Sequence, residues 1–223
     1  MLRGEAALVA AVVMDSFGVV LMLQSGAGIS AVSSVPYAFS LVLPWLTLGT
    51  WTYLFHGVLV ASLMLMRRRF VPEYLFSFVV GFCFGKLLDF YKSWMDVLPQ
   101  TLPLRLVYFV VSYLVLCLGI ALSNRCRLPI IPTDLFPREL GDITGWQYPC
   151  IKIGYDVICL ATTAVMTVVF LGHLEGLGIG TVLAALTMGK GIGMIGDVLD
   201  RHVTFVSVLG HEVLDPAPEE DPA

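Results

Sequence analysis

The apolar stretch SFVVGFCFGK (residues 77–86) ends on a lysine, and TVLAALTMGK (residues 181–190) repeats its pattern about a hundred residues later. In each stretch, Gly-Lys follows eight residues that are almost all apolar or small. Each stretch also belongs to a longer apolar run, and about 18 such residues are enough for a helix to cross a bilayer. The pair therefore predicts membrane-spanning helices that occur in two related halves of the chain.

The composition is typical of a membrane protein. Hydrophobic residues make up 57% of the 223 residues and charged residues 13%, about half the charged share of a soluble globular domain. Such a chain has too little polar surface to cover a water-soluble globule. We expect an all-α integral membrane protein with six transmembrane helices, at residues 6–24, 46–66, 74–94, 104–122, 149–171 and 176–199.

The N-terminal apolar run has two interpretations. Arg3 and the run that follows resemble a signal peptide, with SGA (residues 25–27) as a cleavage site. The run is about 19 residues long, however, and the apolar core of a typical signal peptide is shorter. The length favours a first transmembrane helix that is retained.

The sequence lacks the patterns that mark most enzymes. Its five scattered cysteines indicate neither a disulfide framework nor a zinc site. GIGMIG (residues 191–196) matches the dinucleotide-binding pattern, but that pattern needs a preceding strand, so close helix packing explains it better. No nucleophile–base pair, phosphate-binding loop or basic nucleic-acid-binding stripe occurs. We therefore expect no enzyme activity, no cofactor, no metal and no nucleic-acid partner.

Three further matches between the halves occur in the same order along the chain: GVVLMLQ (18–24) with GIALSNR (119–125), SSVP (33–36) with DLFP (134–137), and GTWTY (49–53) with TGWQY (144–148). Because each half holds three spans, an odd number, the second half must enter from the opposite face. This predicts two inverted three-helix repeats, an arrangement common in transporters. We divide the chain into a first repeat (1–100), a second repeat (101–205) and an acidic, proline-rich tail (206–223) that is expected to be disordered.

Each repeat contains an unusual linker after its first span. Residues 25–45 are apolar but rich in Gly, Ser and Pro, and residues 126–147 contain several prolines together with charged residues. One interpretation is a pair of broken or re-entrant segments that approach a central site from opposite faces. Such backbone is tolerated at membrane depth only where protein or a water-filled cavity satisfies it. The other interpretation is a pair of ordinary loops at the membrane interface.

The arginines predict the orientation of the chain. RRR (residues 67–69) separates the second and third spans, and Arg125, Arg127 and Arg138 lie between the fourth and fifth. The other three linkers between spans hold no Lys or Arg. Under the positive-inside rule, the arginine-bearing linkers are cytoplasmic. Both termini are then expected to be cytoplasmic as well.

Three motifs carry a family resemblance: the proline segment LPIIPTDLFPREL (128–140), the Gly-Thr-Trp that begins the second span (49–51), and GIGTVLAALTMG (178–189) in the sixth. Over residues 18–197 the chain resembles the YczE/YyaS/YitT-like group of multi-pass bacterial membrane proteins. The first half lacks the Gly-x-Gly-Thr start of the third span, so strict symmetry is not expected. The resemblance implies transport of an unestablished substrate across the bacterial cytoplasmic membrane.

Two lysines lie inside predicted spans. An ionisable residue at the centre of a membrane helix costs about 2.5 to 3.5 kcal/mol on insertion scales, so such residues indicate function by default. Lys86 and Lys190 lie at comparable depths from opposite faces, slightly past the midplane. Facing inward, they would form a cationic pair for an anionic group. Facing outward, their long side chains would reach the interface.

Several other ionisable residues lie in or between the spans. Asp89 follows Lys86 by three residues and could either neutralise it or take part in coupling. His56, near the centre of the second span, could relay protons or bond a neighbouring helix. Asp15 is central in the first span, and its role stays open. Asp156 is spaced to pair with Lys152 at i, i+4. The candidate substrate-binding residues are Lys86, Asp89, Lys190, His56, Asp134 and Asp156.

These features predict a transporter that binds a small polar or anionic solute between its two halves. Three alternatives stay open: a passive channel, a substrate-capture subunit that needs partner proteins, and a membrane protein that assists synthesis or export of another product. The expected partners are the lipid bilayer and a small solute. A homodimer or coupling subunits are further partners that the sequence leaves open.

Overall fold

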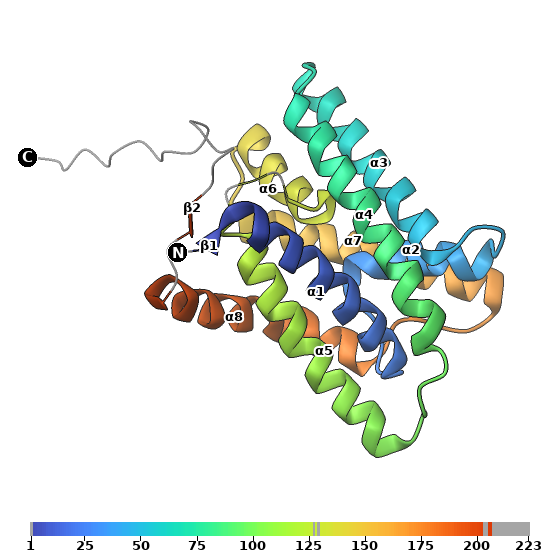
Figure 1. Ribbon diagram of the computed structural model, residues 1–223. Helices are drawn as coiled ribbons and strands as arrows, with labels where there is room; N and C mark the ends of the chain where they lie inside the picture. Colours follow the sequence, from blue (N-terminus) through green and yellow to red (C-terminus); the bar gives the residue numbers. More distant parts are fainter. Residues whose placement is uncertain (1, 127, 129, 203–204, 207–223) are drawn as a thin grey trace, which may run out of the picture.

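The computed structural model describes residues 2–126, 128, 130–202 and 205–206 (Figure 1). Helices make up nearly all of this part of the chain: α1 (Gly4–Gln24), α2 (Ala31–Val42), α3 (Leu48–Arg67), α4 (Pro72–Met95), α5 (Leu102–Ser123), α6 (Pro132–Thr144), α7 (Tyr148–Leu171) and α8 (Ile179–His202). Two strands of two residues, β1 (Leu2–Arg3) and β2 (Phe205–Val206), pair in parallel. The expected all-α architecture is confirmed.

Six of these helices are long and apolar enough to cross a membrane, as the sequence predicts. The observed helix ends lie within a few residues of the predicted ones. The sixth helix begins at Ile179 rather than at Gly176, because Gly176 has a φ of 76° in the left-handed region and belongs to the preceding turn. Arg127 and the predicted tail from residue 207 onward lie outside the described residues.

The two proline-containing linkers fold into the short helices α2 and α6, with Pro36 and Pro137 inside them. With 12 and 13 residues, these helices are about 20 Å long, too short to cross a hydrocarbon core of about 30 Å. Most of α2 is buried against other helices. For α2 this burial favours a segment packed inside the protein over an exposed loop, whereas in α6 only Pro132, Leu135 and Pro137 are buried.

The helix packing centres on α1 and α5, the first long helices of the two halves, which contact each other extensively. In the first half α4 packs on α1, and in the second half α8 packs on α5. Each short helix crosses to the other half, because α2 packs on α7 and α6 packs on α3. Figure 1 shows α3 and α4 side by side, and their contact is also extensive.

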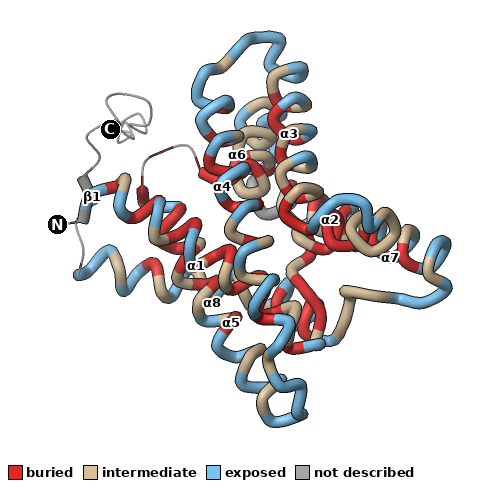
Figure 2. The backbone as a smooth tube through the Cα atoms, turned by 45° about the vertical axis from the view of Figure 1, so that its right-hand side comes forward, coloured by how far each residue is buried: buried red, intermediate tan, exposed pale blue. Residues whose placement is uncertain are grey.

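Burial differs strongly between the centre and the periphery of the molecule (Figure 2). In the most apolar window of α1, 61% of the residues are buried, against 17% for α7 and 11% for α8. Exposed side chains on α7 and α8 are largely apolar, for example Val169 and Leu186. Such surfaces are suited to lipid contact, since a side of a membrane helix that neither packs on protein nor lines a cavity faces hydrocarbon.

Two glycines allow α1 and α5 to approach closely. A Cβ atom on Gly18 would overlap Leu116 on α5, and a Cβ atom on Gly119 would overlap Asp15 on α1. In each helix, the residue three positions before the glycine packs on the glycine of the other helix. The contact is therefore reciprocal: each helix supplies both a glycine and the side chain that packs against its counterpart.

Candidate functional site

A cavity of about 470 Å³ lies where α1, α2, α4, α5, α6, α7 and α8 come together. Its polar lining consists of Asp15, Ser30, Ser33, Asn124, Thr133, Asp134, Lys152 and Asp156. Much of the remaining wall is apolar, including Val19, Phe84, Leu116, Ile120, Met188 and Ile192. A mostly apolar hollow with a few polar groups is the usual form of a small-molecule site, and its volume lies in the usual range.

Asp15 is the most unusual group in this cavity wall. Asp15 lies in the middle of α1 and is only 4% exposed. Neither of its carboxylate oxygens has a hydrogen-bond partner among the described residues. The absence of a side chain on Gly119 makes room for the carboxylate at the α1–α5 contact. Burying a carboxylate without a hydrogen-bond partner is unfavourable in free energy. The presence of Asp15 at this position therefore lowers the stability of the folded protein.

Asp156 and Lys152 form the ion pair that their spacing predicts. The Lys152 ammonium nitrogen lies 2.9 Å from Oδ1 of Asp156, one turn along α7. Both side chains are partly exposed and line the cavity. This pair therefore brings one positive and one negative charge to the cavity wall.

Asp134 reaches the cavity from the first turn of α6, where its backbone N–H donates to the Ile131 carbonyl. A carboxylate in this position is favoured by the positive end of the helix dipole. Burial nevertheless raises the pKa of Asp134, with Asp156 acting in the same direction, while Lys152 and Arg138 act to lower it. The neutral form of Asp134 is therefore more favoured here than in water.

The charges around the cavity are unequal. Three carboxyl groups, those of Asp15, Asp134 and Asp156, line it together with one ammonium, that of Lys152. When ionised, these groups give the cavity a net negative charge. The sequence offered a cationic pair of Lys86 and Lys190 for an anionic group if both lysines face inward, and the groups that line this cavity are of a different kind.

Neither lysine of the predicted cationic pair lines this cavity. Lys86 is exposed on α4, where its ammonium lies 5.9 Å from the ring centroid of Tyr53 and 5.5 Å from that of Phe82. Lys190 is exposed on α8, although the preceding Gly189 contributes to the cavity wall. The structure thus places both lysines on the outer surface of their helices.

Asp89 and His56 both lie away from the cavity, and their surroundings differ: Asp89 is hydrogen-bonded, whereas neither ring nitrogen of His56 has a hydrogen-bond partner among the described residues. The Asp89 carboxylate accepts hydrogen bonds from Thr47 Oγ1 at 2.6 Å and from the Gly49 N–H at 2.7 Å, which caps the start of α3. No ion pair joins it to Lys86 among the described residues. His56 is fully buried between α3 and α4, and Gly81 makes room for its ring. Neither residue lines the cavity.

Comparison with protein-family models gives a match over residues 2–197, to a family of unknown function named DUF6198. The chain belongs to DUF6198. No curated protein and no solved structure matches the chain. The resemblance to the YczE/YyaS/YitT-like group therefore stays a prediction. The family match and the six apolar helices together describe a multi-pass membrane-helical protein.

Of the six candidate residues predicted from the sequence, this DUF6198 chain brings Asp134 and Asp156 to the cavity. The sequence placed Asp15 centrally in the first span but left its role open. The signal that could have selected it is the alignment of Gly18 with Gly119, because Asp15 precedes Gly18 by one helical turn and packs against Gly119. Lys152 was predicted as the partner of Asp156 but was not assigned to the site.

Proposed function

We propose that this protein is a membrane transporter that binds a small polar solute in the cavity between its two halves. The observation that carries the proposal is Asp15, an unpaired carboxylate on the cavity wall in the middle of an apolar helix. Ionisable residues inside membrane helices usually mark substrate or ion pathways, because their insertion is costly. If Asp15 had a purely structural role, a neighbouring residue would be expected to donate a hydrogen bond to its carboxylate. None of the described residues does so.

We also propose that the two halves are inverted repeats. Both halves have the same order of elements: a long helix, a short helix with an internal proline, and two long helices. The crossed packing of α2 on α7 and of α6 on α3 supports this proposal. So does the reciprocal contact of Gly18 and Gly119, because a two-fold relation makes every contact occur twice with exchanged roles.

The two halves differ in the surroundings of one pair of equivalent glycines, Gly85 and Gly189. Gly49 and Gly85 bring α3 and α4 into backbone contact. Gly189, the counterpart of Gly85, has no described atom within 4 Å of the position of a Cβ atom. It lines the cavity instead. We propose that the solute enters the cavity beside Gly189 on α8 and that the halves rock against each other to alternate access.

The proposal can be tested by a solute screen on the purified protein. Thermal stabilisation in detergent would identify binders, and flux of a binder would then be measured in liposomes. Saturable flux that shows counterflow would support a carrier. Flux that does not saturate would indicate a channel. Binding without flux would indicate a capture subunit that needs partners, and absence of binding to every class of solute would contradict the proposal.

Substitutions can show whether the solute binds in this cavity or at a cationic site formed by Lys86 and Lys190. We expect Asp15→Asn to weaken binding of an identified solute by about tenfold or more, as is typical for loss of a charged hydrogen bond. Lys86→Met and Lys190→Met should leave binding close to that of the parent, since both side chains lie outside the cavity. Loss of binding in the lysine variants with retention in Asp15→Asn would favour the lysine site.

A further inference from the structure

We infer that the solute is an organic cation with an ammonium group next to an apolar body, and that the carboxylate of Asp15 binds the ammonium. This inference rests on the proposed function, because it names the class of solute for the same cavity. It starts from the two oxygens of Asp15, which have no hydrogen-bond partner among the described residues. An ammonium group supplies both the donors and the opposite charge that these oxygens lack.

The charge balance of the cavity points to the same class of solute. Asp134 and Asp156 add two more carboxyl groups, and the ammonium of Lys152 is bonded to Asp156. Charges interact more strongly in a poorly hydrated site than in water. Because Lys152 is already paired with Asp156, an ionised Asp15 leaves this wall with excess negative charge, which attracts a solute cation and repels an anion.

The geometry favours an organic cation over a bare metal ion. Among the described residues, no three His, Cys, Asp or Glu side chains come close enough together to hold a metal ion. The wall beside Asp15 is apolar, with Val19 and Leu116 on it and Phe84 and Met188 in the same cavity. These side chains would pack on the hydrocarbon part of a solute and stabilise it by burial.

Three probes of similar size test this inference directly. Phenethylamine, 2-phenylethanol and 3-phenylpropionate all carry a phenyl group, and at neutral pH they are a cation, a neutral molecule and an anion. Their affinities would be measured by titration calorimetry on the protein in nanodiscs. We expect phenethylamine to bind at least about tenfold more tightly than the other two, which is the effect of one charged hydrogen bond.

Any other order of affinities overturns the inference about the cation. The proposed function is then still tested by the solute screen. Equal or tighter binding of 2-phenylethanol or 3-phenylpropionate would show that the cavity does not select a cation, while still showing a solute site. Failure of all three probes to bind would also overturn the inference. The broad solute screen described above would then decide the proposed function independently.

The role of Asp15 is tested by substitution and by labelling. Asp15→Asn should weaken phenethylamine binding by about tenfold to a hundredfold, and Asp142→Asn, which alters an exposed carboxylate outside the cavity, should not. Should Asp15→Asn fail to fold, the parent protein can be treated with dicyclohexylcarbodiimide and the modification of Asp15 followed by mass spectrometry. Phenethylamine should slow this modification and 2-phenylethanol should not. Unchanged binding, or labelling that phenethylamine does not slow, would overturn the role of Asp15.

Discussion

At the scale of single residues, Asp15 and Gly119 form a matched pair. The carboxylate lies at the contact between α1 and α5, and a Cβ atom on Gly119 would overlap it. A charged residue at the centre of a membrane helix costs about 2.5 to 3.5 kcal/mol on insertion scales. The missing side chain of Gly119 thus leaves room for the Asp15 carboxylate at a position on the cavity wall.

We expect Gly119→Ala to destabilise the protein by about 1 to 3 kcal/mol, the usual effect of an added methyl group in a close contact. The methyl would press on the Asp15 carboxylate and push α1 away from α5. The measurement is the thermal midpoint of unfolding in detergent. Gly154→Ala is the matched control, because a Cβ atom there has no described atom within 4 Å. Equal midpoints for the two variants would contradict the close contact.

The raised pKa of Asp134 predicts that the stability of the protein depends on pH. Because burial raises its pKa, ionisation is less favourable in the folded protein than in the unfolded chain. Its contribution to stability is therefore fully present below its ordinary pKa of about 3.9 and is lost as pH rises through the raised value. The other charged groups that face it are Asp15, Asp156, Lys152 and Arg138.

Asp134→Asn removes this titration. We expect the thermal midpoint of the variant to fall less than that of the parent as the pH is raised from about 4 to about 8, a range that starts near the ordinary pKa of the group. Asp142→Asn, which changes an exposed carboxylate on the same helix, should retain the pH dependence of the parent. If the profiles of Asp134→Asn and the parent coincide, burial does not disfavour the ionised form of Asp134.

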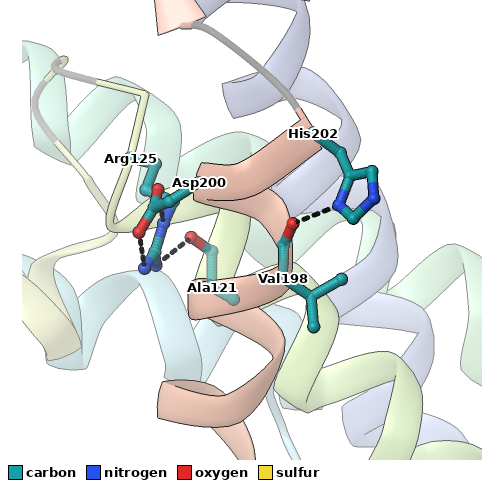
Figure 3. Close-up of polar contacts among 5 residues, drawn as sticks. All are labelled: Ala121, Arg125, Val198, Asp200 and His202. Atoms are coloured by element: carbon teal, nitrogen blue, oxygen red, sulfur yellow. Dashed lines mark hydrogen bonds and ion pairs between the residues drawn. The ribbon is translucent and has the colours of Figure 1, made fainter.

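At the scale of elements, α8 is a long helix with few buried residues. It is attached mainly to α5. Near its middle, the Tyr113 hydroxyl donates to Thr187 at 3.0 Å. At its far end, Arg125 forms a two-pronged contact with Asp200, with both N···O distances at 2.6 Å, and also donates to the Ala121 carbonyl at 3.3 Å (Figure 3). These contacts hold one wall of the cavity in place.

Arg125→Lys should loosen the end of α8, because lysine cannot reproduce the planar two-pronged contact with a carboxylate. We expect faster hydrogen exchange near Asp200 in the variant, measured by mass spectrometry. His202→Gln is the control. In Figure 3 the His202 ring is bonded to the Val198 carbonyl, which belongs to the same helix, so this bond does not attach α8 to α5. Unchanged exchange in Arg125→Lys would mean that the ion pair does not hold α8.

At the scale of the whole molecule, the crossed packing of the short helices ties the two halves together. The Ser34 hydroxyl on α2 lies 2.8 Å from the Thr163 hydroxyl on α7. On the other side, the Tyr74 hydroxyl on α4 donates to Glu139 on α6, and Arg67 on α3 lies 2.7 Å from the same carboxylate. A rocking movement of the halves would have to rearrange these contacts.

The proposed inverted repeat makes a prediction about topology. Single cysteines at Arg68 and in the C-terminal tail should both be labelled from the cytoplasmic side, whereas a cysteine at Gln100, between α4 and α5, should be labelled from outside. The measurement is labelling of intact cells with a membrane-impermeant maleimide, before and after permeabilisation, in a background without reactive native cysteines. Labelling of Arg68 and the tail from opposite sides, or of Arg68 and Gln100 from the same side, would exclude the inverted arrangement.

Properties that are local along the chain could be predicted from the sequence. The length of each apolar run determined the six long helices, since about 20 residues span a bilayer. The spacing of Lys152 and Asp156 determined their ion pair, because i and i+4 share a helix face. The linkers with Pro36 and Pro137 could be singled out by composition, although their helical form and crossed packing could not.

Only the tertiary structure decided which side chains share the cavity. In a helix that is apolar on nearly all sides, such as α1, the pattern does not show which face will meet protein and which will meet lipid. The rotation of each helix is set by its packing partners, here by glycines such as Gly119. For this reason Asp15 and Asp134 line one cavity while Lys86 and Lys190, equally costly in a membrane helix, lie on the outer surface.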